Sequence, residues 1–337
     1  MTHEPSQHEA GETRAIAALT GLALGDALGM PAQTMSRNDI RSHYGGIEGF
    51  IAPFDGHPVS HGLSACQVTD DTEQTLLLAE RLIGDPDGFD DAGWARDLLD
   101  WEAGIKAKGL SDLLGPSSRA AIDALLSGAS PLETGRKGTT NGAAMRIAPV
   151  GIMMPADPER LVAKVFSTCR VTHNTGEAIA AASAVAMVVS CGIEGRSFDR
   201  CLDPALSAAR LGQTFGNEIG ERDMAGRIET ALKLAENGTE EDLVSRIGSS
   251  VASRESIPMA FGLLRLHENT PWDALLAAAN IGDDTDTIAA IVGAMAGATG
   301  WQPPRGFIDL LNSANNLELA EPARRLIALR GREAEKD

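Results

Sequence analysis

The chain has 337 residues, of which 29 are basic and 47 are acidic, so its formal net charge is −18 at pH 7. Nucleic acids are bound by clustered lysine and arginine; the longest basic cluster here is the pair Arg324-Arg325, which argues against a nucleic-acid partner. Hydrophobic residues make up 43% and charged residues 23%, which excludes global disorder. Aromatic residues are only 4%, and the abundance of Ala and Leu favours helices over sheets.

The ends and the cysteines of the chain predict a cytoplasmic protein. Its four cysteines are far apart and form no Cys-x-x-Cys pair, which indicates free thiols in a reducing compartment. The first residues are polar and acidic, unlike a signal peptide, and we expect residues 1–12 to be a mobile tail before one domain at 13–333. The longest apolar run, Ala178 to Ile193, is shorter than the about 20 residues of a membrane span. We therefore expect no membrane partner.

Apolar residues at spacings of three and four predict helices along the whole chain. These helices are Glu12–Leu28, Thr72–Ile83, Gly93–Ala103, Ser117–Leu126, Asp157–Cys169, Arg222–Asn237, Met259–His267, Trp272–Asn280 and Ala320–Arg330. Pro258 and Pro271 are expected to open the helices that follow them. Ile47–Ile51 is the best strand candidate. The fold class is all-α, a single compact domain with the nearly all-round apolar helices Ala178–Ile193 and Ile288–Thr299 at its centre.

Two acidic clusters stand directly before apolar helices, with the sequences TDDT at 69–72 and DDTDT at 283–287. One Asp or Thr in each would serve as a helix N-cap. A cap does not account for two or three adjacent carboxylates beside a core helix, because desolvation strengthens the repulsion between like charges. A bound cation would remove this penalty, and carboxylate and hydroxyl oxygens suit Mg²⁺ or Mn²⁺ rather than Zn²⁺. The two clusters together predict a two-ion site.

Three further features are less specific. The segment 138–146 reads GTTNGAAMR, and its open backbone N–H groups could hold a phosphate or a sugar hydroxyl. Arg146 could clamp a ligand or form an internal salt bridge, and the salt bridge is the favoured interpretation. His173 could cap the following buried helix or line a site. Gly293 and Gly297 lie four residues apart in an apolar helix, which would let another helix approach closely.

The order of these motifs resembles the ADP-ribosylglycohydrolase family. The shared motifs are GLALGDALG at 21–29, TDDT at 69–72, NGAAMR at 141–146, the pair Thr172-His173, and GDDTDT at 282–287. The resemblance implies an all-α fold with a central cleft that holds two divalent cations, Mg²⁺ or Mn²⁺. It also implies hydrolysis at C1 of a ribosyl unit, often at the bond between ADP-ribose and a modified protein side chain.

Carried over by position, the resemblance implies two sets of site residues. The implied metal ligands are Thr69, Asp70, Asp71, Asp284, Asp286 and Thr287. The implied substrate contacts are Gln33, Thr139, Thr140, Asn141, Gly142 and His173. The general base is left open among the carboxylates Asp71, Asp284 and Asp283.

The sequence also departs from the family pattern. Gln33 stands where many members have a Glu, and an amide cannot accept a proton as that carboxylate would. Lys137-Gly138-Thr139-Thr140 replaces a Gly-Ser-aromatic-Gly arrangement, and Asp283 adds a carboxylate. A nucleoside or another small ribosyl compound is therefore an alternative substrate, and a non-catalytic, crystallin-like ADP-ribose binder is a second alternative. An all-α isoprenoid synthase is disfavoured, because the Asp-Asp-x-x-Asp spacing is missing and aromatic residues are few.

Overall fold

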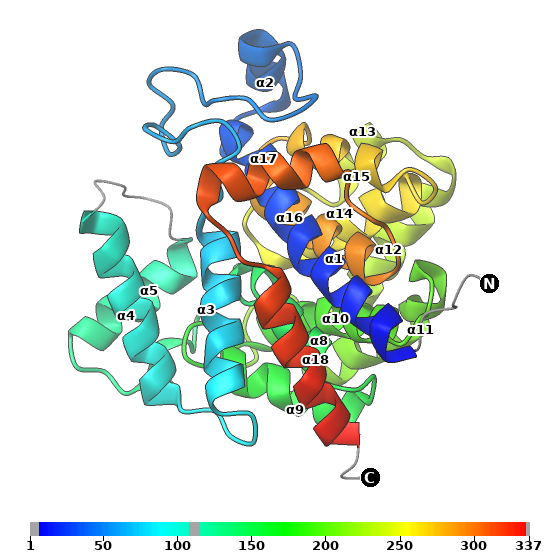
Figure 1. The fold of residues 1–337 in the computed structure, drawn as a ribbon. Helices are drawn as coiled ribbons and strands as arrows, with labels where there is room; N and C mark the ends of the chain where they lie inside the picture. Colours follow the sequence, from blue (N-terminus) through cyan, green and yellow to red (C-terminus); the bar gives the residue numbers. More distant parts are fainter. Residues whose placement is uncertain (1–6, 108–114, 335–337) are drawn as a thin grey trace.

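The structure, a computed structural model, describes residues 7–107 and 115–334 (Figure 1). Within these ranges the protein is all-α, as predicted, and its only β-type pairings are isolated bridges. The helices in chain order are α1 (Gln7–Gly29), η1 (Met30–Ala32), α2 (Arg37–Tyr44), α3 (Asp70–Gly84), α4 (Asp91–Ala107), α5 (Pro116–Leu126), α6 (Pro131–Thr134), α7 (Gly142–Met145), α8 (Ala148–Met153), α9 (Pro158–Cys169), α10 (Gly176–Ile193), α11 (Phe198–Gly212), α12 (Met224–Asn237), α13 (Glu240–Arg246), α14 (Ser253–Leu266), α15 (Pro271–Ala279), α16 (Thr285–Ala298), α17 (Arg305–Asn315) and α18 (Ala320–Ala334).

Helices α1 and α16 pack along their length with their backbones in contact (Figure 1). A Cβ atom added to Gly21 would collide with the carbonyl of Gly293, and one added to Gly25 would collide with the carbonyl of Ala289. Gly297 meets the backbone of α1 in the same way. The close approach predicted from the two glycines of α16 is confirmed, and its partner is α1.

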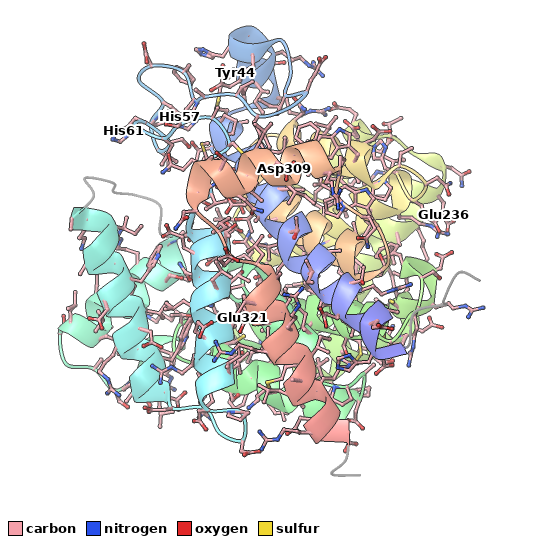
Figure 2. All side chains as sticks on the ribbon, viewed as in Figure 1. Tyr44, His57, His61, Glu236, Asp309 and Glu321 are labelled. Atoms are coloured by element: carbon pink, nitrogen blue, oxygen red, sulfur yellow. The ribbon has the colours of Figure 1, made fainter. Side chains whose placement is uncertain are left out.

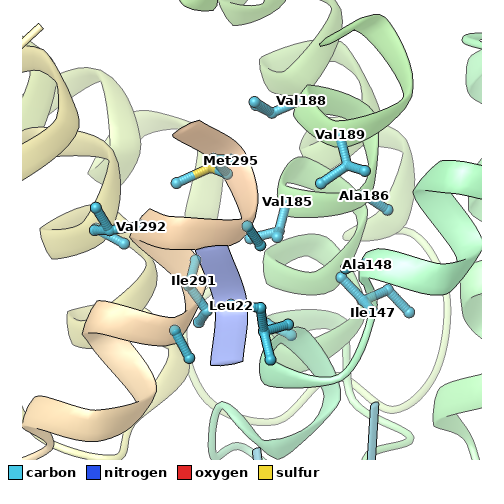
Figure 3. Packing of buried hydrophobic residues seen from close by; sticks show 14 of the residues in the cluster. Leu22, Ile147, Ala148, Val185, Ala186, Val188, Val189, Ile291, Val292 and Met295 are labelled. Carbon is cyan, nitrogen blue, oxygen red and sulfur yellow. The ribbon is translucent and has the colours of Figure 1, made fainter. Parts of the chain in front are cut away.

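Helix α10 forms the other side of the core, and every one of its residues is buried, as predicted. Figure 3 shows Val185 of α10 on the side that faces α16, which carries Ile291 and Met295. Two helices, His8–Ala32 and Gly176–Ile193, have the length and composition of a membrane span, but 94% and 100% of their apolar windows are buried inside the domain. Such burial is typical of core helices.

Helix α14 corrects the expectation that Pro258 opens a helix. Pro258 lies inside α14, which begins at Ser253. A proline within a helix cannot bond the carbonyl four residues earlier, here that of Arg254. The side chain of Arg227 replaces the missing donor, because its Nε–H bonds the Arg254 carbonyl at 2.6 Å. Pro271 opens α15 as predicted.

The structure also differs from the predicted elements at other places along the chain. Ile47–Ile51 forms no strand; the backbone N–H of Ile47 instead bonds the Asn280 side chain at 2.8 Å. Helix α1 begins at Gln7, so it includes residues 7–12 of the expected tail, whereas residues 1–6 lie outside the described ranges. Eight helices within the described ranges have no counterpart among the predicted elements, and these are η1, α2, α6, α7, α8, α11, α13 and α17. Helix α2 and the irregular segment up to α3 project above the helical body, where Figure 2 labels Tyr44, His57 and His61.

The contact between α1 and α16 makes a direct prediction for Gly25→Ala. Alanine favours an exposed helix by about 1 kcal/mol over glycine, but here its methyl group would displace a main-chain carbonyl of α16. We expect a net loss of about 2 kcal/mol in the free energy of unfolding, measured by urea denaturation. Gly331→Ala in α18 is the control, because open space surrounds Gly331. Equal stability of the two variants would contradict the packing argument.

Candidate active site

Asp26 of α1 organises the start of α3. Its buried carboxylate accepts hydrogen bonds from the backbone N–H groups of Thr69 at 3.0 Å and Thr72 at 3.1 Å. It also accepts from the hydroxyls of Thr69 at 2.8 Å and Thr72 at 2.5 Å. Asp26 therefore supplies the side-chain cap that Thr69, the N-cap residue of α3, does not provide. This role was not predicted from the sequence, in which Asp26 is a single carboxylate in the apolar half of a helix.

The structure brings the two predicted acidic clusters together. Asp70 and Asp71 occupy the first turn of α3, and Asp286 occupies the first turn of α16. The Thr287 hydroxyl of α16 donates to Asp71 Oδ2 at 3.3 Å, so the two helix starts are in contact. Asp284 is the N-cap residue of α16, yet its side chain makes no capping hydrogen bond. Helix capping therefore does not explain these carboxylates.

The carboxylates of the cluster are buried close to one another, and this raises their pKa values. Desolvation raises the pKa of Asp70, Asp71 and Asp286 well above the usual range, and neighbouring carboxylates raise it further. Desolvation likewise raises the pKa of Asp26 to about 6 and that of Asp284 to about 7. Within the described ranges, no ion pair involves any of these five carboxylates. The buried Arg146 guanidinium reaches Asp70 through the Gln74 side chain and forms no ion pair with it.

Part of the predicted site lines one cavity of about 210 Å³. Its walls include the following predicted metal ligands and substrate contacts: Asp70, Asp284, Asp286, Thr287, Gln33, Thr140, Asn141 and Gly142. Thr69 and Asp71 are buried and do not line it, and His173 lies fully buried next to Thr140. The Thr139 carbonyl accepts from the backbone N–H of Ser253 at 3.0 Å, and its side chain does not line the cavity.

Asp283 lies apart from the cavity-lining carboxylates. Its side chain is exposed, and its φ of 64° is in the left-handed region. Its backbone pairs with the turn after η1, since its N–H bonds the Met35 carbonyl at 2.8 Å and its carbonyl accepts from Thr34 N–H at 2.6 Å. The backbone of Asp283, rather than its side chain, therefore holds the loop that carries Gln33.

Asn141 orients Asp284. Its Nδ2 donates to Asp284 Oδ2 at 2.5 Å and to Ser256 Oγ at 3.0 Å. The Ser256 hydroxyl gives its only proton to the Ala252 carbonyl at 3.1 Å, so it can only accept from Asn141. The amide nitrogen of Asn141 is thereby directed at the Asp284 carboxylate.

Gln33 has an equally fixed orientation. The Ser60 hydroxyl donates to the Met30 carbonyl at 2.8 Å, so it must accept from Gln33, whose Nε2 lies 2.9 Å away. Gln33 lines the cavity, and its Oε1 accepts no hydrogen bond from the residues that the structure describes. His57 holds Ser60 in place, because its Nδ1 accepts from the Ser60 backbone N–H at 2.8 Å. Gln33 is thus a neutral acceptor in the cavity wall.

Arg146 forms neither of the contacts considered for it. It is 1% exposed, does not line the cavity, and pairs with no carboxylate among the described residues. The expected salt bridge is therefore wrong. Its guanidinium donates to Gln74 Oε1 at 2.6 Å and to Thr172 Oγ1 at 2.5 Å, and it lies over the ring of Trp94.

The donor chemistry of the cluster fits a hard divalent cation. Asp71 Oδ1 and Asp286 Oδ1 are buried without a hydrogen-bond partner in the described part of the chain. Unpartnered carboxylate oxygens are the ligands that Mg²⁺ and Mn²⁺ prefer. However, no three His, Cys, Asp or Glu side chains of the described residues already converge as a ligand set. The carboxylates raise one another's pKa without meeting at one point.

Comparison with known proteins agrees with this fold. The sequence profile of the ADP-ribosylglycohydrolase family matches residues 7–333. The chain is 34% identical to the uncharacterized protein YegU of Escherichia coli (strain K12), over 85% of this chain and 87% of that protein. It is 28% identical to the ADP-ribosylarginine hydrolase Tri1 of Pseudomonas putida (strain GB-1), over 85% of this chain and 70% of that protein.

A solved structure supports the fold independently. An ADP-ribosylglycohydrolase-related protein complex superposes with a TM-score of 0.67 at 22% identity, over 95% of this chain and 99% of that chain. The family match and the similarity to named ADP-ribosyl hydrolases define the protein as a glycosidase-type hydrolase. The chain belongs to the ADP-ribosylglycohydrolase family, as the order of its motifs predicted.

The raised pKa values of Asp26 and Asp284 predict how stability depends on pH without divalent cations. Both lie above the unfolded-state value near 3.8, so the folded state binds more protons, and the stabilising contribution is lost as pH rises from about 4 through 7. The free energy of unfolding should therefore decrease with pH in the wild type. In Asp284→Asn the slope of this decrease should be smaller by up to about 1.4 kcal/mol per pH unit. Urea denaturation in chelator from pH 5 to 8 measures it.

The control for this titration is Asp309→Asn, at an exposed position of α17 labelled in Figure 2. Burial and the nearby Arg146 lower the pKa of His173, which adds an opposite slope below about 6.5 in every variant. The comparison between variants removes that contribution. A slope in Asp284→Asn equal to that of the wild type would contradict the raised pKa of Asp284.

Proposed function

We propose that this protein hydrolyses the C1 N- or O-glycosidic bond of an ADP-ribosyl conjugate, on a small molecule or on a protein, with two divalent cations, Mg²⁺ or Mn²⁺. The observation that carries the proposal is the meeting of two uncompensated acidic clusters at one cavity. The similarity to a hydrolase that acts on ADP-ribosylarginine supports this substrate class. Four free, buried cysteines support a cytoplasmic location.

The cation ligands in this proposal come from the starts of α3 and α16. The cavity-lining carboxylates of Asp70, Asp284 and Asp286 and the Thr287 hydroxyl would hold the ions, with Asp71 and Thr69 behind them. Bound cations of this kind supply Lewis acidity and orient sugar hydroxyls and water. Asp26 keeps the first turn of α3 in place by accepting from its backbone.

The remaining side chains position the substrate and handle the proton. Of the three candidate bases, Asp284 lines the cavity, whereas Asp71 is buried beside it and Asp283 is exposed. Asp284 is therefore the carboxylate placed to accept a proton from the attacking water, in the orientation set by Asn141. The carboxylates also stabilise the positive charge that develops on the sugar as its C1 bond breaks. Gln33 accepts from a sugar hydroxyl rather than acting as a base.

A nucleoside or another small ribosyl compound is the second candidate substrate. One observation favours it: no Lys or Arg of the described residues lines the cavity, so the diphosphate of ADP-ribose would have to be held by neutral donors. The Thr139-Thr140 pair also brings no aromatic ring on which an adenine could stack.

Turnover on a substrate panel tests the proposal. The panel contains ADP-ribosylated arginine and serine peptides and free nucleosides, each with Mg²⁺, Mn²⁺ or chelator, and released sugar is read by chromatography. We expect cleavage of an ADP-ribosyl conjugate that is lost in chelator and reduced at least about 100-fold in Asp284→Asn, because the variant lacks both a ligand and the base. Asp309→Asn should match the wild type.

The panel also separates the alternatives. Cleavage of nucleosides alone would replace the ADP-ribosyl substrate by the smaller one. Tight binding of ADP-ribose without turnover on any compound would identify a non-catalytic binder. Full activity of Asp284→Asn in chelator would overturn the two-cation proposal.

Cation binding can be tested without turnover. Protons compete with cations for carboxylates of raised pKa, so Mn²⁺ should raise the Tm of the wild type more at pH 8 than at pH 5.5. The increase should be largely absent in Asp284→Asn and retained in Asp309→Asn. An equal increase in all three proteins would show that Mn²⁺ binds elsewhere.

A further inference from the structure

A chain of hydrogen bonds connects the buried guanidinium of Arg146 with the wall of the cavity. Arg146 Nη2 lies 2.5 Å from Thr172 Oγ1, and that oxygen lies 2.7 Å from His173 Nδ1. On the other side of the ring, His173 Nε2 lies 3.0 Å from Thr140 Oγ1. Arg146, Thr172 and His173 are all buried, whereas Thr140 is half-buried and lines the cavity.

The direction of this chain is fixed at its buried end. A guanidinium only donates, so Thr172 Oγ1 accepts from Arg146. The single hydroxyl proton of Thr172 then has His173 Nδ1 as its acceptor, and a buried hydroxyl proton without an acceptor would cost free energy. Nδ1 of His173 is therefore unprotonated.

The protonation state of His173 determines the direction of its hydrogen bond with Thr140. Complete burial and the positive charge of Arg146 lower the pKa of His173 well below its usual value, so the ring is neutral. A neutral ring with an unprotonated Nδ1 carries its proton on Nε2. Nε2–H then donates to Thr140 Oγ1. Gly142 makes room for the ring, because a Cβ at this position would lie 2.9 Å from His173 Cε1.

Thr140 is the last residue of this series of hydrogen bonds. Its oxygen accepts from His173, and its hydroxyl donates to no described protein atom, so the proton is free to point into the cavity. We propose that the Thr140 hydroxyl is a dedicated hydrogen-bond donor to an acceptor oxygen of the substrate, and that Arg146 fixes this direction through Thr172 and His173. Thr140 is then a specificity-determining contact, and the other three are positioning residues.

A second branch from the same guanidinium reaches the acidic cluster. Arg146 Nη1 donates to Gln74 Oε1 at 2.6 Å, and this directs Gln74 Nε2 toward Asp70 Oδ2 at 3.2 Å. Asp70 also lines the cavity. One buried cation thus fixes hydrogen-bond direction toward two points of the cavity wall, where Thr140 offers a donor and Asp70 offers an acceptor. A substrate oxygen such as a phosphoryl or carbonyl oxygen is favoured at Thr140, and a substrate N–H is disfavoured.

The donor-to-acceptor direction of these hydrogen bonds can be measured without any substrate. Nitrogen-15 NMR distinguishes the two neutral tautomers of histidine and the imidazolium ion, and the chain has seven histidines. A His173→Gln variant assigns the resonance. We expect the Nε2–H tautomer in the wild type at pH 7, and a mixture of tautomers in Thr172→Val, which separates His173 from Arg146. An Nδ1–H tautomer or an imidazolium in the wild type would overturn the proposal.

The role of Thr140 toward the substrate rests on the proposed function and needs turnover. Thr140→Val should lower kcat/KM on the best substrate of the panel about 10-fold, the usual loss for one neutral hydrogen bond. Thr140→Ser keeps the hydroxyl and should retain activity within about twofold. The exposed Thr230→Val on α12 is the control for loss of a threonine hydroxyl and should match the wild type.

Combining the variants tests whether the residues act as one chain. Thr172→Val should reduce kcat/KM to a similar extent as Thr140→Val, and the double variant should be no worse than either, because both changes remove the same donor. Multiplied losses, or an unaffected Thr140→Val, would overturn the proposal. If the panel gives no turnover, the proposed function fails, while NMR still decides the direction of the chain.

Discussion

The main-chain contact between α1 and α16 is the constraint on which the site depends. Glycines on both helices remove the side chains that would separate them, and Gly29 lies against the backbone of Thr285 and Asp286. The end of α1 is thereby held at the start of α16. Asp26 then binds the first turn of α3. Three helix termini meet in this way, and the carboxylates of two of them face the same cavity.

The buried carboxylates that line the cavity also destabilise the folded protein. Five carboxylates are buried near one another, and the described ion pairs of the protein lie elsewhere. Such a cluster lowers the stability of the folded chain at neutral pH, and the apolar helices α1, α10 and α16 must offset that cost (Figure 3). Polar residues around the cluster, such as Asn141 and Gln74, donate to it without adding charge of the opposite sign. The site is thus organised by dipoles and left open to cations.

The sequence predicted the features that depend on local pattern. Helical periodicity identified the buried helices, and the excess of carboxylates over what capping requires indicated that the two acidic clusters are more than helix ends. The missed features depend on contacts between distant segments. Arg227 replaces the hydrogen bond lost at Pro258, Asp26 caps a helix far along the chain, and Arg146 bonds neutral partners. Spacing along the chain carries no information about such pairings.

The cap that Asp26 provides to α3 also bears on the order of folding. Several helices of this protein, among them α9, α10 and α13, receive a cap from their own N-cap residue, so they can begin locally. The first turn of α3, which holds Asp70 and Asp71, instead receives its cap from α1. This turn becomes fully hydrogen-bonded only after α1 has docked. The position of Asp70 and Asp71 is therefore coupled to the docking of a core helix, and the like charges of this turn are held in place by a contact from outside their own helix.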